Sequence, residues 1–340
     1  MVGEDRPVLI VAEAGVNHNG RLDLAKRLVD TAKDVRADAV KFQTFVASRV
    51  ISRLAPKANY QIDQRAREET QLEMASKLQL AANDFRAISE HAEKRGILFF
   101  STPFDEESAD LLEELGVPMF KISSGDLTHL PFLEYVAKKG RPMIISTGMS
   151  TLEEVRSAVE TVRSCGNEEI VLTHCVSSYP ARAEDVNLRA MNTLRSAFQV
   201  PVGYSDHTLG FEVAVAAVAS GACLIEKHLT LDKSLEGPDH KASLDPPEFL
   251  HMTKAIRLVE LALGSGTKTP SKSEREIMRV ARRSIVARRD IQEGDVITRD
   301  MIDFKRPATG FPPSSLSEVL GGRAARTIRA DESIGPKDMK

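Results

Sequence analysis

The sequence predicts a (β/α)8 TIM barrel followed by a small, mostly β domain. The chain has 340 residues, which is enough for one large α/β domain and one small domain. Across residues 1–265, short apolar runs rich in β-branched residues alternate eight times with helical patterns. Continuous apolar runs are typical of parallel strands that are covered on both faces. Eight β/α units within this length are typical of a TIM barrel.

The eight strand-like runs follow one another in order, separated by helical patterns. The runs are Val8–Gly15, Asp38–Phe45, Leu98–Phe104, Met119–Gly125, Pro142–Gly148, Glu169–Ser177, Val200–His207 and Cys223–Thr230. The clearest helical patterns are Leu22–Val35, Asp84–Arg95, Thr128–Lys139, Thr151–Ser164 and a last helix from Pro246 to about Leu263. Ser150 and Glu153 have the spacing of a capping box at the start of one of these helices.

The main rival to the barrel is a doubly wound open sheet. That fold usually carries a glycine-rich phosphate-binding turn after its first strand. Here the first strand leads into Gly15-Val16-Asn17-His18-Asn19-Gly20, which does not have the G-x-G-x-x-G spacing. The barrel is therefore the preferred prediction.

We expect a barrel domain over residues 1–268, a linker over 269–280 and the small domain over 281–340. The linker is predicted from the Gly-, Ser-, Thr- and Lys-rich composition around Pro270. Within the small domain, Asp290–Ile297 has the pattern of a strand, a turn and a second strand, and Lys305-Arg306-Pro307 places two cations on a rigid loop. A domain of this size without disulfides is marginally stable, so we expect it to pack on another surface.

Composition and charge exclude several classes of protein. Residues 271–340 contain 15 Lys and Arg against 11 Asp and Glu, a net charge of +4, which leaves −7 on residues 1–270. The basic residues alternate with acidic ones and lack aromatic partners, so we expect no nucleic-acid binding. No apolar run approaches the roughly 20 residues of a membrane span. The charged N-terminus is unlike a signal peptide, and three widely spaced cysteines fit a reduced, cytoplasmic protein.

Two histidines end two of the predicted strands. His207 follows Ser205 by two residues, and His228 follows Glu226 by two. Alternate residues of a strand face the same side, so the four side chains would meet if the strands are neighbours. Each histidine alone is more simply explained as a satisfied strand-end residue. Together, two imidazoles beside a carboxylate predict a half-open site for a divalent metal.

Polar residues also end the other strands, which is where TIM barrels have their active sites. Lys41 precedes Gln43 by two residues, and Lys121 precedes Ser123 by two, so each pair faces the same side of its strand. A lysine in an apolar strand needs a partner, because burial of an unpaired ammonium is costly. Lysines within a ring of hydroxyls predict a cradle for a phosphate or carboxylate. Any one serine at a strand end is usually just a helix N-cap. The set is Glu13, Lys41, Gln43, Thr102, Lys121, Ser123, Ser124, Ser146, Ser177, Tyr179, Ser205, His207, Glu226 and His228.

Over nearly its whole length the chain resembles the sialic acid synthases, which have a TIM barrel followed by an antifreeze-like (SAF) domain. The matching barrel motifs are Ala12–Gly20, Val40–Phe45, Ser101–Phe104, Lys121–Gly125, Ser146–Met149, His174–Pro180, Gly203–Thr208, Ile225–His228 and Gly237–His240. Lys305-Arg306-Pro307 matches in the small domain. These motifs are long, keep their order and cover both predicted domains.

The resemblance implies that phosphoenolpyruvate (PEP) condenses with the open-chain aldehyde of an N-acetylmannosamine-like sugar. The products would be a nine-carbon 2-keto acid and phosphate, released by C–O cleavage. It implies a divalent cation, Mn²⁺ before Mg²⁺ or Co²⁺, held by His207 and His228. Glu226 and Glu13 would be catalytic. PEP would contact Lys41, Thr102, Lys121, Ser124, Ser146, Ser177 and Ser205, and the sugar Glu13, Gln43, Asn59, Tyr179, Asp239 and Arg306.

The resemblance also implies a domain-swapped homodimer in which the SAF domain, with its Arg306, caps the partner barrel. Two positions depart from the pattern: Ser177 replaces the Asn of some members, and Asn59 lies in a variable loop. The motif Gly15–Gly20 fits the sialic and legionaminic acid branches better than the pseudaminic branch. The sequence leaves the exact amino sugar open, including whether it is phosphorylated.

Two alternative functions remain at this point. One is another metal-dependent aldolase or 3-deoxy-keto acid synthase on the same barrel, and an aldolase that uses pyruvate would release no phosphate. The other is a non-catalytic sugar- or ice-binding protein, suggested by the antifreeze-like tail. A decayed enzyme should have lost the lysines or histidines, and all of them are present.

Overall fold

The structure is a computed structural model that describes residue 3, residues 6–57 and residues 69–340. The chain forms two compact units, Met1–Gly264 and Ser265–Lys340. Asn59, one of the predicted sugar-binding residues, lies outside the described residues.

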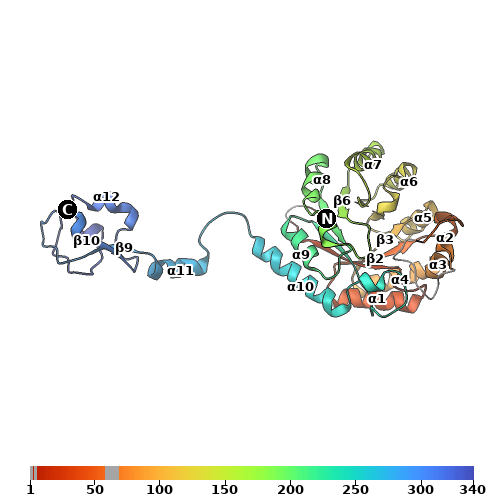
Figure 1. The fold of residues 1–340 in the computed structure, drawn as a ribbon, viewed down its shortest axis with the longest axis horizontal. Helices are drawn as coiled ribbons and strands as arrows, with labels where there is room; N and C mark the ends of the chain where they lie inside the picture. The colour runs from red at the N-terminus through yellow and green to blue at the C-terminus, as the bar shows by residue number, and fades with distance from the viewer. Residues whose placement is uncertain (1–2, 4–5, 58–68) are drawn as a thin grey trace. The chain divides into compact units, whose positions relative to one another are not determined.

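The first unit is a barrel of eight parallel strands surrounded by helices (Figure 1). Its strands are β1 Leu9–Gly15, β2 Ala39–Thr44, β3 Leu98–Pro103, β4 Phe120–Ile122, β5 Met143–Ser146, β6 Ile170–Cys175, β7 Val202–Asp206 and β8 Leu224–His228. Hydrogen bonds join them in the order β3-β2-β1-β8-β7-β6-β5-β4, and β3 and β4 lie side by side to complete the ring. The predicted TIM barrel is confirmed.

Helices follow the strands and cover the outside of the barrel. They are α1 Leu22–Asp34, α2 Ala47–Val50, α3 Gln71–Leu78, α4 Ala82–Arg95, α5 Glu106–Glu114, α6 Leu130–Ala137, α7 Leu152–Ser164, α8 Ala190–Phe198, α9 Glu212–Ala219 and α10 Pro246–Leu263. The capping box of α7 is formed by Thr151 and Glu154, one residue later than predicted for Ser150 and Glu153. Both pairs have the required spacing, and the Ser150 hydroxyl instead donates to the carbonyl of Gly148.

The core lies between the strands and their covering helices. Alternate strand residues such as Ile10, Ala12 and Phe42 are fully buried there. The residues between them face the barrel axis, and the strand register aligns their polar members. Glu13 is opposite both Lys41 and His228 in the strand register. These three residues of β1, β2 and β8 therefore lie at the same height along the barrel axis, near the carboxyl ends of the strands.

The second unit is small and built around a two-stranded antiparallel sheet. Strands β9 Ser284–Ala287 and β10 Ile302–Lys305 pair with each other. The predicted strand–turn–strand over Asp290–Ile297 is wrong, because this stretch only makes single bridges from Ile291 to Ile328 and from Val296 to Arg323. Ile291 and Ile297 are instead part of the core of the unit, together with Ile285, Ile302, Ile328 and Ile334.

Two helices complete this unit, α11 Lys272–Ala281 and α12 Leu316–Val319. Helix α11 occupies most of the segment predicted to be a linker and ends one residue beyond it. The Ser271 side chain accepts from the Glu274 backbone, and the Glu274 carboxylate accepts from Ser271, so a capping box begins the helix despite the polar composition. None of the helices in the described part of the chain is both long and apolar enough to cross a membrane.

Candidate active site

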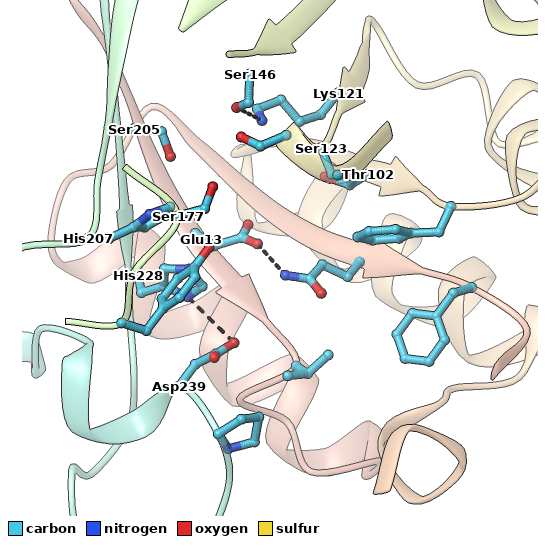
Figure 2. Close-up of a pocket in the computed structure, with 18 of the residues that line it drawn as sticks. Glu13, Thr102, Lys121, Ser123, Ser146, Ser177, Ser205, His207, His228 and Asp239 are labelled. Carbon is cyan, nitrogen blue, oxygen red and sulfur yellow. Dashed lines mark hydrogen bonds and ion pairs between the residues drawn. The ribbon is translucent and has the colours of Figure 1, made fainter. Parts of the chain in front are cut away.

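A cavity of about 550 Å³ opens at the carboxyl end of the barrel strands. Figure 2 shows the polar side chains that point into it from different strands. Glu13, Lys41, Gln43, Thr102, Lys121, Ser123, Ser124, Ser146, Ser177, Tyr179, Ser205, His207, Glu226, His228 and Asp239 all line it. The structure thus brings together every barrel residue that the sequence singled out for chemistry within the described residues.

The first part of the site is a buried group of charges on β1 and β2. The Lys41 ammonium lies 2.8 Å from Oε2 of Glu13 and donates to the Thr102 hydroxyl at 3.0 Å. Gln43 donates from Nε2 to Oε1 of Glu13 at 3.1 Å. Gly15 makes room for this contact, because a Cβ there would lie 3.2 Å from the Glu13 carboxylate at a backbone φ of +51°. The Glu13 side chain is therefore held by partners on both oxygens.

The second part is the strand-end ring of β4, β5, β7 and β8. Lys121 donates to the Ser146 hydroxyl, and Ser205 donates to Oε1 of Glu226 at 3.0 Å. The same Glu226 oxygen lies 3.8 Å from Nζ of both Lys41 and Lys121. One buried carboxylate is thus shared between two buried ammonium groups. An incoming anion would be attracted to the same two cations.

The pKa values of the Glu13 and Glu226 carboxyl groups are shifted in opposite directions. Burial raises the pKa of Glu13 to about 7, against the opposing attraction of Lys41. Burial also acts to raise the pKa of Glu226, but Lys121 and Lys41 outweigh it and hold that pKa below its ordinary value. Near neutral pH, Glu13 can therefore both give and take a proton, whereas Glu226 remains ionised. A pair of acids driven apart in this way is typical of acid–base catalysis.

The third part contains the two histidines. Their rings lie 5.7 Å apart, and the Tyr179 ring lies 4.2 Å from His207. Nδ1 of His207 donates to the carbonyl of Val176 at 2.7 Å, which leaves the other ring nitrogen with a free lone pair. Burial lowers the pKa of both imidazoles, so both are neutral and able to coordinate a cation.

The donor set fits a divalent cation. Nδ1 of His228 and Oε2 of Glu226 are buried and make no hydrogen bond within the described chain. Oδ2 of Asp239 lies 4.0 Å from Nδ1 of His228 (Figure 2). Imidazole nitrogens and carboxylate oxygens are the ligands that such ions prefer. Among the described residues, however, no three His, Cys, Asp or Glu side chains are already arranged around one point.

A serine- and thiol-lined corner completes the polar wall. The Ser124 hydroxyl accepts from the backbone of Gly148 at 3.0 Å and lies 3.0 Å from Sγ of Cys175. A Cβ at Gly148 would lie 2.4 Å from the Ser177 hydroxyl, so only glycine permits this packing. Ser177 therefore lies with the predicted phosphate-binding residues. Cys175 was missed by the sequence analysis, although its place at the end of β6 was a usable signal.

An apolar wall faces these polar groups, and the sequence analysis missed it too. Its members are Phe45, Val50, Ile51, Met74, Leu78 and Phe104. Phe45 and Phe104 directly follow β2 and β3, while the others come from α2, the residue after it and α3. Arg306 is exposed and belongs to the second unit, which is described by itself, so its predicted contact with the sugar remains a prediction.

Comparison with known proteins identifies the family. The model of the NeuB family matches residues 28–268, and that of the SAF domain matches residues 282–340. The chain belongs to the NeuB family. Two relatives are named N,N'-diacetyllegionaminic acid synthase: that of Legionella pneumophila is 49% identical over 98% of this chain and 94% of its own, and that of Campylobacter jejuni is 47% identical over 97% and 99%.

Other relatives of lower identity are named after other acids. The human N-acetylneuraminate-9-phosphate synthase is 38% identical over 98% of this chain and 93% of its own. The crystal structure of a sialic acid synthetase from Leptospira borgpetersenii, in complex with citrate, is 36% identical, with a TM-score of 0.73 over 82% of this chain and 92% of that one. This NeuB protein is accordingly an enzyme, an acid synthase.

Proposed function

We propose that this enzyme condenses PEP with 2,4-diacetamido-2,4,6-trideoxymannose and water to give N,N'-diacetyllegionaminic acid and phosphate. The observation that carries the proposal is the single cavity in which Lys41, Lys121 and their hydroxyl ring face His207 and His228. The first group suits a small polyanion, and the second suits a metal-assisted aldehyde. Three carbons from PEP and six from the sugar give the nine-carbon product.

The lysines and hydroxyls would hold PEP. Lys41 and Lys121 supply charge, while Thr102, Ser124, Ser146, Ser177 and Ser205 supply hydrogen bonds around it. In this site, C3 of PEP forms a bond to the aldehyde carbon of the sugar. Water then adds to C2, and the C–O bond to phosphate breaks.

Glu13 and Glu226 would move the protons. The raised pKa of Glu13 suits a group that donates a proton to the aldehyde oxygen as the new C–C bond forms. Glu226 is ionised and has a buried oxygen without a hydrogen bond, which suits a base that takes a proton from the attacking water. A Mn²⁺-type ion at His207 and His228 would supply Lewis-acid polarisation of the aldehyde.

The choice of acceptor rests on the relatives and on the apolar wall. The two relatives at 47–49% identity are legionaminic acid synthases by name. A 6-deoxy sugar with two acetamido groups offers three methyl groups, each worth about 0.8 kcal/mol when buried against Phe45, Met74 or Phe104. Lys41 and Lys121 are the lysines among the described lining residues, and the proposal assigns both of them to PEP. A sugar 6-phosphate would therefore compete with PEP for the same two cations.

Phosphate release from PEP tests the reaction and the acceptor together. EDTA-stripped enzyme would be assayed with and without Mn²⁺ against N-acetylmannosamine, its 6-phosphate and 2,4-diacetamido-2,4,6-trideoxymannose. We expect release that requires both the metal and the trideoxy sugar, with kcat/KM at least about tenfold above that of N-acetylmannosamine, since lost methyl contacts cost about 1–3 kcal/mol.

Each of the other outcomes would contradict part of the proposal or favour another function. Metal-independent release would remove the assigned role of the two histidines. Product formed from pyruvate without phosphate would indicate the aldolase. If the folded protein released no phosphate with any of the three sugars, this would favour another aldehyde acceptor or a binding protein without catalysis.

The proposal includes a homodimer in which the SAF domain of each subunit caps the barrel of the other. This part of the proposal is supported by the resemblance of the sequence to the sialic acid synthases and by Arg306, which is exposed on the loop after β10. We expect Arg306→Ala to raise the sugar KM about tenfold or more and to leave the PEP KM within about twofold, as a lost charge-assisted hydrogen bond would. Steady-state kinetics with each substrate varied in turn measures this split.

Mixed dimers then distinguish a swapped arrangement from an unswapped one. Glu226→Gln inactivates a barrel, whereas Arg306→Ala leaves its own barrel intact. If Arg306 acts on the partner barrel, mixing and reassembling the two variants restores sites that combine an intact barrel with an intact Arg306. If Arg306 acts within its own subunit, mixing restores nothing.

A further inference from the structure

The Val16–Gly20 loop after β1 packs against the loop that joins β8 to α10, more than 200 residues further along the chain. The proposed function assigns no role to the residues of this loop, Asn17-His18-Asn19-Gly20. It is nevertheless buried at the edge of the active-site cavity, since Asn17 and His18 are each 1% exposed. Its contacts lead directly to Asp239.

Asn17 makes the central contact. Its Nδ2 donates to the carbonyl of Leu229 and to the hydroxyl of Ser243, each at 2.9 Å. The Ser243 hydroxyl in turn donates to the backbone carbonyl of Asp239 at 2.7 Å. One amide group therefore joins the end of β8 to the residue that carries the Asp239 carboxylate into the cavity. All four residues are buried.

A second contact fixes the same loop from its other side. Nδ2 of Asn19 donates to the carbonyl of Glu236 at 2.8 Å, and its Oδ1 lies 3.2 Å from Nε2 of His240. His240 is fully buried and also lies 2.7 Å from the Thr230 hydroxyl. Gly237 fits closely between them, because a Cβ there would lie 2.7 Å from the His240 ring. Asp239 thus lies between Glu236 and His240, both of which are held by hydrogen bonds.

The motif also reaches the apolar wall. A Cβ on Gly20, whose φ is +69°, would lie 2.2 Å from the backbone carbonyl of Lys77, so the loop touches the C-terminal end of α3. Helix α3 contributes Met74 and Leu78 to the cavity. The loop after β1 therefore contacts two segments assigned to the sugar side, α3 and the loop that carries Asp239.

We infer that Asn17 is a positioning residue for the acceptor sugar, acting through Ser243 to hold Asp239 in place. This inference rests on the proposed function for its kinetic consequence, because it assigns Asp239 to the sugar. Without the Asn17 amide, the Leu229 and Ser243 partners lose a buried donor and the loop 230–243 loosens. The proposed PEP contacts, Lys41, Lys121 and the strand-end hydroxyls, take no part in this hydrogen-bond network, so we expect the PEP KM to change little.

Asn17→Ala and Ser243→Ala test the inference, with Asn167→Ala as the matched control. Asn167 is also buried and also donates from Nδ2 to a backbone carbonyl, that of Arg141 at 2.9 Å, but it precedes β6 at the other end of the barrel. We expect both test variants to raise the sugar KM about tenfold, with the PEP KM within about twofold. The control should leave both constants unchanged. Equal changes in the two KM values, or the same pattern in the control, would overturn the inference.

A double-variant cycle and hydrogen exchange separate positioning from general damage. If Asn17 acts through Asp239, adding Asn17→Ala to Asp239→Ala should raise the sugar KM by less than about twofold. The backbone amides of Ala242 and Ser243, which donate to the Asp239 carbonyl, should exchange at least about tenfold faster in Asn17→Ala than in wild type or in Asn167→Ala. Unchanged exchange would overturn the inference.

Hydrogen exchange needs no substrate, so it decides the role of Asn17 even if no sugar of the panel is turned over. In that case the proposed function fails while the positioning role is judged separately. Should Asn17→Ala not fold, Ser243→Ala alone still removes the link to Asp239 and carries the same two expectations.

Discussion

Replacement of Glu226 by Gln is expected to lower kcat about 10²- to 10⁴-fold, the usual contribution of a general acid or base, while PEP binding is retained or becomes tighter. Glu226 is the only carboxylate within 4 Å of both Lys41 and Lys121 among the described residues. Its neutralisation removes negative charge from the site of an anionic substrate and leaves the two cations in place. Catalysis and binding should therefore change in opposite directions.

The measurement pairs phosphate release with calorimetric titration of PEP. Glu160→Gln, an exposed position on α7, is the control for loss of a carboxylate and should change neither quantity. A Glu226→Gln enzyme that keeps its kcat would contradict the proton-transfer role. One that loses PEP binding would show that Glu226 mainly arranges the lysines.

The largest expected effect on stability comes from Lys227→Met. Lys227 points away from the cavity, between Glu226 and His228, and pairs with Asp206 at 2.8 Å with neither side chain exposed. It also donates to the carbonyl of Thr208. Removing one partner of such a pair leaves an uncompensated buried charge, which costs roughly 3–5 kcal/mol. We expect that loss in the unfolding free energy of the barrel, measured by urea denaturation.

A second variant separates the charge from the packing. Adding Asp206→Asn to Lys227→Met should recover part of the loss, because no unpaired buried charge then remains. Lys138→Met, at an exposed lysine paired with Glu134 on α6, should change stability little. A small effect at Lys227, similar to that at Lys138, would show that the buried pair is not what fixes the ends of β7 and β8.

Strand periodicity made most of the barrel and its polar ring predictable. A residue such as Ser205 or His207 must face the same side as its neighbour two positions away. Parallel strands in a barrel also present their carboxyl ends together, so polar residues at those ends converge whatever their distance in sequence. The pairing of Ser205 with Glu226 follows directly once β7 and β8 are adjacent.

Local signals were less reliable outside the barrel strands. The composition before the small domain predicted a linker and gave no sign of α11, which the capping box of Ser271 and Glu274 begins there. The apolar residues of Asp290–Ile297 suggested a strand, a turn and a second strand, yet Ile291 and Ile297 belong to the core of the second unit and make no named strand. At α11 the deciding signal was local but was masked by the polar composition, whereas at Ile291 and Ile297 contacts with distant core residues made the choice.

The sequence by itself determined the barrel, the membership of its polar ring and the candidate metal and anion ligands, because strand alternation is a local property. Only the tertiary structure decided how Glu13 and Glu226 differ, since their pKa values depend on burial and on the distances to Lys41 and Lys121. It also revealed the apolar wall and the link from Asn17 to Asp239. Such contacts join loops, whose paths have no period in the sequence and follow from how the whole chain packs.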